Sequence, residues 1–154
     1  MKRLIFLILI FLWLGCASTL LRFEQYSMVM NLPVAADSSV TLGNEDHFSG
    51  ILWLNPILRA ENVPTTQVKL IQNYGIYFLC AEKFRHVWMV ERGNDGLSGK
   101  HKAIDVTPAD ETDAYSNIYL SRYGTLQKTF VKFKFNNGEV YLDRKGHFYE
   151  KYIE

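Results

Sequence analysis

The amino-acid sequence predicts a mainly β protein, an antiparallel meander of the sandwich or barrel kind with one or two short helices. Three observations predict this fold class. Polar and apolar residues alternate along Val131–Phe135, apolar runs of strand length recur upstream, and clusters rich in Asn and Gly separate the runs. The alternative is an α+β fold.

Several strands are expected in the first two thirds of the chain. Two of the runs, Ile76–Ala81 and Arg85–Glu91, are apolar without alternation, which is typical of strands that are covered on both faces. The segment Pro64–Gln72 fits a short helix and a strand equally well. The other expected strands are Leu21–Met30, His47–Leu54 and Lys100–Val106.

A helix is predicted to begin at Pro108. The segment Thr107–Asp110 has a threonine that can cap a helix, a proline at the first helical position and an acid two residues later. Gly124 could end this helix. However, Ile118 and Leu120 also alternate with polar residues as they would in a strand, so the far end of the helix is left open.

The C-terminal quarter predicts a three-stranded meander. Val131–Phe135 alternates as a half-buried strand, and Asn136–Gly138 suits the positive φ angles of a tight hairpin turn. Glu139–Asp143 returns as the second strand. Asp143–Gly146 forms a second turn, and His147–Ile153 is the third strand.

The first sixteen residues carry a targeting signal. Met1-Lys2-Arg3 is a short basic start, Leu4–Leu14 is an apolar run too short to span a bilayer, and Gly15 precedes Cys16. This segment resembles the signal of bacterial lipoproteins. The resemblance implies that residues 1–15 are an export signal and that Cys16 becomes the first residue of the mature chain, held in a membrane by fatty acyl chains such as palmitate.

The resemblance also implies a place in the cell. Ala17 after the cysteine, in place of Asp, favours the outer membrane under the sorting rule of enteric-type lipoproteins, with the domain facing the periplasm. The signal departs from the usual pattern at Trp13 and Leu14. The alternatives are a plain cleaved signal and an uncleaved anchor, because the apolar span Leu4–Leu21, about eighteen residues, is close to the lower limit for a membrane helix. The rest of the chain is exported in each case.

Composition limits the remaining chain to one domain. Residues 16–154 leave about 139 residues, enough for a single envelope-anchored β-rich domain and too few for two. Without Lys2 and Arg3 there are 15 basic and 16 acidic residues, a net charge of −1, which argues against nucleic-acid binding. If Cys16 carries lipid, Cys80 has no disulfide partner, and its apolar neighbours predict a small buried residue rather than a reactive thiol.

Familiar motifs of catalysis and metal binding are missing from the sequence. Gly96–His101 lacks the first glycine and the hydroxyl residue of a phosphate loop. Cys80 with His86 is one possible ligand pair, but a structural zinc site needs four ligands. One acidic cluster has no glycine turn for calcium and fits acids at a helix start better. Its members are Asp105, Asp110, Glu111 and Asp113. We therefore expect no catalytic residue, no cofactor and no metal.

Tyrosines provide the candidate binding surface. Tyr115, Tyr119 and Tyr123 are four residues apart, a spacing that places them on one face of a helix or of a strand. Three more tyrosines, at positions 141, 149 and 152, crowd the last two expected strands. Tyrosine combines a flat apolar ring with a polar tip and suits recognition surfaces, although small β domains also bury tyrosines at the edge of the core.

Three hypotheses of function follow. The first is a non-catalytic binding module or accessory subunit of an envelope complex, which contacts another envelope protein. The second is an immunity-type or exclusion-type inhibitor of an envelope enzyme or receptor. The third is a small envelope hydrolase, which would need His86 or His147 to face a carboxylate in a concave pocket.

Overall fold

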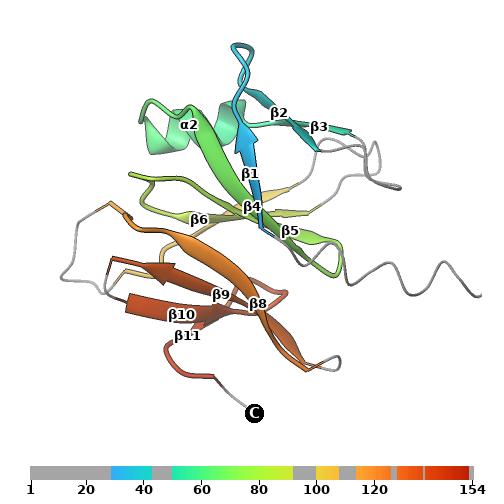
Figure 1. Ribbon diagram of the computed structural model, residues 1–154, viewed down its shortest axis with the longest axis vertical. Coiled ribbons are helices and arrows are strands. Elements are labelled where there is room, and N and C mark those ends of the chain that lie inside the picture. Colours follow the sequence, from blue (N-terminus) through green and yellow to red (C-terminus); the bar gives the residue numbers. More distant parts are fainter. Residues whose placement is uncertain are drawn as a thin grey trace, which may run out of the picture.

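The mainly β fold class is confirmed by the structure, a computed structural model that describes residues 29–42, 50–91, 100–107, 114–125, 128–136 and 138–152. In these ranges the chain forms three antiparallel sheets and one short helix (Figure 1). The predicted export signal, residues 1–15, and Cys16 lie outside the described residues.

A five-stranded antiparallel sheet forms the centre of the molecule. Its strand order is β1-β4-β5-β6-β7, so the last four strands are neighbours both along the chain and in the sheet. Tyr74 and Gly75 make the tight turn between β4 and β5, and both have positive φ, 51° and 83°. The strands are β1 (Met30–Pro33), β4 (Gln67–Asn73), β5 (Ile76–Cys80), β6 (Val87–Glu91) and β7 (His101–Ile104).

Both faces of this central sheet are covered. The neighbouring residues Phe78 and Leu79 of β5 point to opposite faces, and the exposed fraction of each is 0%. Asn73 of β4 donates a hydrogen bond to the Thr129 carbonyl of the second sheet, whereas Trp88 of β6 reaches the helix on the other side. The prediction that Ile76–Ala81 and Arg85–Glu91 are covered on both faces is therefore confirmed.

A four-stranded antiparallel sheet packs against one face of the central sheet. Val131, Phe133 and Phe135, alternate residues of its strand β9, point into the core, as the alternation of the sequence predicts. Asn136, with φ of 47°, begins the turn that follows. The strand order is β11-β10-β9-β8, with β8 (Tyr119–Gly124), β9 (Thr129–Phe135), β10 (Gly138–Leu142) and β11 (Phe148–Tyr149).

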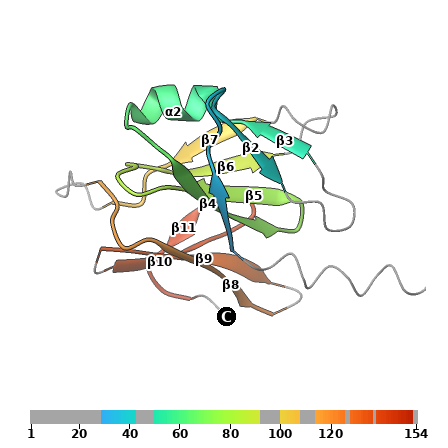
Figure 2. The same cartoon turned by 45° about the horizontal axis from the view of Figure 1, so that its top comes forward.

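A third layer covers the other face of the central sheet. It consists of the hairpin of β2 (Ser39–Leu42) and β3 (Gly50–Trp53) together with the helix α2 (Asn55–Glu61). Figures 1 and 2 show this layer and the four-stranded sheet on opposite sides of β4–β6. Within the described residues, the chain therefore stacks three layers, and the central sheet supplies the core to both neighbours.

The helix predicted from Pro108, whose far end was left open, does not extend into the described residues. Residues 114–118 are not helical, and Tyr119–Gly124 is the strand β8. Leu120 pairs with Phe133 and is fully buried, so burying the alternating side chains of this segment outweighs the helix-start signals that precede it. The predicted start itself, Pro108–Asp113, lies outside the described residues.

Other segments differ from the expectation mainly in their bounds. Most of the ambiguous segment 64–72 is a strand, since β4 begins at Gln67 and ends at Asn73. The third strand of the C-terminal meander is short, since β11 holds two residues. The helix α2 and the strand β2 were not predicted. The segments 21–28 and 47–49, parts of two expected strands, lie outside the described residues.

The described helix does not meet the requirements of a membrane span. No helix in the described ranges is both long enough and apolar enough to cross a bilayer.

Candidate functional site

The three tyrosines of the predicted surface do not share one face. Tyr119 and Tyr123 lie on the same face of β8, and their exposed fractions are 57% and 43%. Tyr115 precedes β8 and is fully buried. Tyr119 and Tyr123 therefore fit the expected surface, whereas the assignment of Tyr115 to it is wrong.

Tyr115 is a core residue with a structural hydrogen bond. Its hydroxyl accepts a hydrogen bond from the Val106 backbone N–H at 3.2 Å, and its ring packs against Phe133 and Phe135 at centroid distances of 5.1 and 4.9 Å. Burial raises the pKa of this hydroxyl well above its usual range. Asn117 has a φ of 54°, so the backbone is not regularly extended between Tyr115 and β8. The four-residue spacing therefore does not place Tyr115 on the same face as Tyr119.

The side of the four-stranded sheet that points away from the core carries a second cluster of aromatic side chains. Phe130 and Tyr141 are only 3% and 7% exposed, yet neither belongs to the main hydrophobic core. Other aromatic rings cover them instead. We call this surface the outer aromatic face, and its members are Tyr119, Tyr123, Phe130, Tyr141, Tyr149 and Tyr152.

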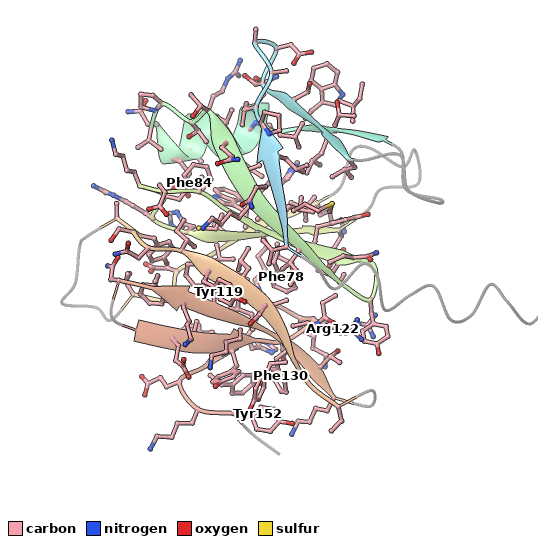
Figure 3. All side chains as sticks on the ribbon, viewed as in Figure 1. Phe78, Phe84, Tyr119, Arg122, Phe130 and Tyr152 are labelled. Carbon is pink, nitrogen blue, oxygen red and sulfur yellow. The ribbon has the colours of Figure 1, made fainter. Side chains whose placement is uncertain are left out.

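Ring contacts bind most of this face into one unit. The ring of Tyr152 lies 4.9 Å from Tyr123, 5.7 Å from Phe130 and 5.9 Å from Tyr141, measured between centroids. Figure 3 shows Phe130 and Tyr152 close together on the four-stranded sheet, apart from Phe78 and Phe84. Such tilted and edge-to-face pairs contribute roughly 0.5–1.5 kcal/mol each beyond the area they bury. Tyr123 lies at the exposed margin of this cluster of packed rings, and Tyr119 is exposed further along the same face of β8.

Charged groups lie among these rings. The Lys132 ammonium is 2.9 Å from the Glu139 carboxylate and lies over the rings of Tyr123 and Tyr141, 5.6 and 5.4 Å from their centroids. Lys134, the cross-strand partner of Tyr119, is 3.5 Å from the same carboxylate and is half exposed. The hydrogen bond to Glu139 raises the pKa of Lys132, and the same bond lowers the pKa of Glu139. One carboxylate therefore balances the charge of only one of the two lysines, so this part of the face has a net positive charge.

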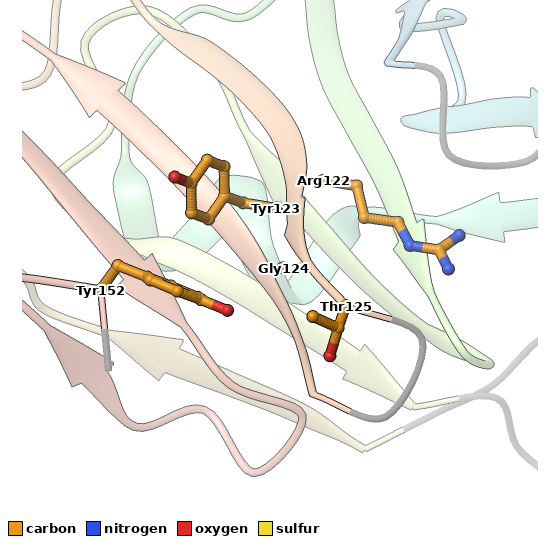
Figure 4. A pocket seen from close by; sticks show the side chains of 5 residues that line it. All are labelled: Arg122, Tyr123, Gly124, Thr125 and Tyr152. Atoms are coloured by element: carbon orange, nitrogen blue, oxygen red, sulfur yellow. The ribbon is translucent and has the colours of Figure 1, made fainter. Parts of the chain in front are cut away.

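An open groove of about 380 Å³ lies at the end of β8. The rings of Tyr123 and Tyr152 are nearly perpendicular, at 83°, and Figure 4 shows both on the side of β8 away from the Arg122 guanidinium. The volume is at the lower end of the range of about 300–1,000 Å³ that is usual for ligand sites, so the groove can accept a side chain of a partner. It is lined by Arg122, Tyr123, Gly124, Thr125 and Tyr152.

Gly124 is required by the geometry beside the groove. Its φ is +110°, and a Cβ at this position would lie 2.2 Å from the Lys128 carbonyl oxygen. The chain can therefore turn from β8 to β9 only with glycine here. This turn places Tyr123 and Thr125 at the rim of the groove.

Arg122 connects the two large sheets. Its guanidinium donates a hydrogen bond to the Tyr74 hydroxyl at 3.1 Å and lies 4.8 Å from the centroid of that ring. Arg144 donates to the Tyr74 carbonyl oxygen, also at 3.1 Å, and lies 5.4 Å from the same centroid. The β4–β5 turn is thus held to β8 and to the turn after β10, which fixes the sheet that carries the outer aromatic face.

Both histidines named in the hydrolase hypothesis face a carboxylate. His86 Nδ1 lies 2.9 Å from Glu61 Oε1 and His147 Nδ1 lies 3.0 Å from Asp143 Oδ2. Glu61 also accepts hydrogen bonds from the Trp88 indole and the Arg85 backbone, both at 2.7 Å, which ties α2 to the central sheet. Neither histidine lines the groove described above. The geometry thus meets one half of the requirement for a hydrolase, a histidine beside a carboxylate, but not in this groove.

The other candidate ligands do not come together. The Cys80 thiol is a free, fully buried group whose sulfur lies 3.6 Å from the backbone carbonyl oxygen of His86, and burial raises its pKa. Asp105 accepts hydrogen bonds from Thr107, which lower its pKa. The acids at 110, 111 and 113 lie outside the described residues. In the described ranges, no three His, Cys, Asp or Glu side chains are placed to hold a metal ion.

Sequence reasoning missed Phe130 and Lys132 as part of the surface. Their signal lies in the alternation of β9: since Val131, Phe133 and Phe135 point inward, Phe130 and Lys132 must point outward. A phenylalanine on the polar side of an alternating strand indicates a second apolar contact.

No protein-family model, no curated protein and no solved structure matches this chain, so the candidate surface is defined by its own geometry.

Proposed function

We propose that this chain is a lipid-anchored protein of the bacterial cell envelope that acts, without catalysis, as a binding module or accessory subunit. In this proposal the outer aromatic face contacts another envelope protein. The N-terminal segment resembling a lipoprotein signal supports the anchor, with Cys16 as the acylated residue, the domain in the periplasm and the outer membrane as its location.

The observation that carries the binding role is an aromatic cluster outside the core. A sheet face turned to water needs no phenylalanine and no row of tyrosines, because polar side chains suffice there. Tyr119 and Tyr123 nonetheless present 57% and 43% of their surface to solvent, and the ring of Tyr123 packs against those of Tyr141 and Tyr152. Tyrosine is enriched in the energetically important centres of protein interfaces, since its ring buries a large area with little loss of side-chain entropy.

The charges around the rings indicate what the partner offers. Lys132 and Lys134 share the single carboxylate of Glu139, so an acidic group on the partner would find a cation beside Tyr119. Charged groups at the rim of an interface steer association and set specificity more than they add affinity. The groove between Tyr123 and Tyr152 would take one side chain of the partner.

The anchor is tested by the intact mass of the protein extracted from membranes in mild detergent. The proposal predicts the mass of residues 16–154 plus acyl groups, and release or retention as an uncleaved precursor for Cys16→Ser. A full-length mass would show that Leu4–Leu21 is an uncleaved anchor, and Cys16 would then be an ordinary residue.

The binding role is tested on the same extracts. The protein is cross-linked and purified, and the yield of the partner that co-purifies with it is measured. Tyr119→Ala should lower the yield of the partner about tenfold or more, since it removes an exposed aromatic contact without opening the core. Phe148→Ala is the matched control: Phe148 is 43% exposed, but its cross-strand partner Leu142 points to the core side of the sheet. Equal loss in both variants would contradict the assignment. A foreign toxin or receptor as partner would favour the inhibitor hypothesis over the accessory subunit.

A further inference from the structure

The exposed side chains of the outer aromatic face lie in a row along β8. Tyr119, Ser121 and Tyr123 point to the same side of the strand, and successive members are roughly 6.6 Å apart, because side chains on one face recur at every second residue. The groove lies at the Tyr123 end of this row. Lys134, which is half exposed, is the cross-strand neighbour of Tyr119 at the other end. The row therefore has a cation at one end and an aromatic groove at the other.

The hydroxyl groups of the row are available to a partner. Among the residues that the structure describes, none makes a hydrogen bond with the hydroxyl of Tyr119, Ser121 or Tyr123. The backbone N–H and C=O groups of an extended segment have no partners within that segment and can bond such hydroxyls. Those of a helix are already paired inside the helix. The row therefore suits an extended segment better than a helix.

The layer that carries the row is basic, and the rest of the chain is acidic. Residues 119–154, which include every strand of the four-stranded sheet, contain seven basic and four acidic residues, a net charge of +3. Residues 16–118 contain eight basic and twelve acidic residues, a net charge of −4. On the outer aromatic face itself, Lys132 and Lys134 share the carboxylate of Glu139. An acidic segment is therefore attracted to this layer and repelled by the remainder of the domain.

We infer that the outer aromatic face binds an extended acidic segment of its partner protein, in which an aspartate or glutamate and an apolar side chain are about four residues apart. The inference rests on the proposed function and names the partner's chemistry. The acid would pair with Lys134, and the apolar side chain would enter the groove between Tyr123 and Tyr152.

The spacing of four residues follows from the length of the row. Tyr119 and Tyr123 are four strand residues apart, roughly 13 Å, and an extended segment covers the same distance with the same number of residues. Its side chains also alternate with the same period as those of β8. A helix would need about nine residues to span this distance. The spacing in the partner therefore distinguishes the two conformations.

The test maps a photo-cross-link between the full chain and its partner in membranes extracted with mild detergent. Benzoylphenylalanine replaces Tyr119, which keeps an aromatic ring in the row. This protein is compared with versions that also carry Lys134→Glu or Lys100→Glu. Lys100→Glu is the matched control, because it makes the same change of charge at an exposed residue that precedes β7 of the central sheet.

We expect Lys134→Glu to lower the yield of the adduct about fivefold or more, since it places a like charge opposite the acid, and Lys100→Glu to change it less than about twofold. The yield from the protein with neither change should fall as NaCl is raised from about 50 to about 500 mM, because salt screens the attraction. Mass spectrometry of the adduct should place the cross-link in a segment with an acid about four residues from an apolar side chain.

Equal yields with and without Lys134→Glu, or a cross-link in a segment that has no acid, would overturn the inference and leave the binding role standing. The absence of an adduct from all three proteins would overturn the binding role, and the inference with it.

Discussion

Tyr115 and Tyr119 are four residues apart and have opposite surroundings. Tyr115 has no exposed surface and its hydroxyl bonds the Val106 backbone, whereas Tyr119 is 57% exposed and makes no ring contact in the described structure. We expect Tyr115→Ala to lower the free energy of unfolding by about 3–5 kcal/mol, because it opens a cavity and leaves a buried N–H unpaired. Tyr119→Ala should change it by less than about 0.5 kcal/mol. Chemical denaturation of both variants measures the difference, and similar values would contradict these surroundings.

Glu61 is a buried carboxylate, and both of its oxygens accept hydrogen bonds. Its side chain has no exposed surface, and it accepts hydrogen bonds from Arg85, His86 and Trp88. Glu61→Gln replaces one acceptor oxygen by an amide donor, so two donors face each other, and we expect a loss of about 2–4 kcal/mol in the free energy of unfolding. The matched control is Glu91→Gln at an exposed position, which should cost less than about 0.5 kcal/mol. Equal costs would mean that this network does not hold α2.

His101 makes stability depend on pH. Burial lowers its pKa below the usual 6.5, and its Nε2 is buried without a hydrogen-bond partner. As the pH falls through 6.5, the unfolded chain takes up a proton that the folded chain does not, so the free energy of unfolding falls. We expect a smaller loss between pH 7.5 and pH 5.5 for His101→Gln than for the wild type. Urea titrations of both proteins at pH 7.5 and pH 5.5 measure this loss, and the other histidines are common to both. An equal loss of free energy of unfolding in the two proteins would show that His101 does not contribute.

At the scale of the element, two glycines distinguish the cost of a steric collision from the cost of backbone strain when alanine replaces glycine. Gly124 and Gly75 both have positive φ, 110° and 83°, but a Cβ on Gly75 meets nothing within 4 Å, whereas one on Gly124 meets the Lys128 carbonyl oxygen. Gly75→Ala should cost about 1–2 kcal/mol from strain alone. Gly124→Ala adds the collision and should cost at least about 2 kcal/mol more. Equal melting temperatures of the two variants would contradict the tight turn from β8 to β9.

The C-terminal meander was predicted correctly because two signals agree there. In the C-terminal meander, alternation along β9 and Asn or Gly at the turn both indicate a hairpin. The helix α2 was missed because its start has no capping side chain and no acid, only Pro56 within its first turn. Its end has a usable signal, Asn62 in the left-handed conformation, but many loops share it.

The segment that forms β8 was left undecided between helix and strand because its local signals conflict. Thr107 and Pro108 resemble a helix start, yet the residues from Tyr119 onward alternate and pair with β9. Burial of Leu120 against Phe133 depends on the fold of the whole domain, which a short window of sequence does not contain. The same limit explains Tyr115, whose inward direction follows from Asn117 and not from residue spacing.

For the whole molecule, layering explains where the candidate surfaces are. The central sheet is buried on both faces, so each outer layer has one face in the core and one in water. Each of these outer faces carries exposed aromatic residues, Trp53 on one and Tyr119 with Tyr123 on the other. The continuous apolar runs of β5 and β6 predicted that both faces of their sheet are covered, but they did not show which outer face would be aromatic.

The central claim is that the outer aromatic face binds another envelope protein, and site-specific photo-cross-linking in intact cells tests it most directly. Benzoylphenylalanine is placed at position 119 in one strain and at position 148 in the other, since Tyr119 and Phe148 are both exposed on opposite sides of the same sheet. The account predicts a discrete adduct of higher mass from position 119 and none from position 148. The same adduct from both positions, or an adduct from position 148 alone, would contradict it.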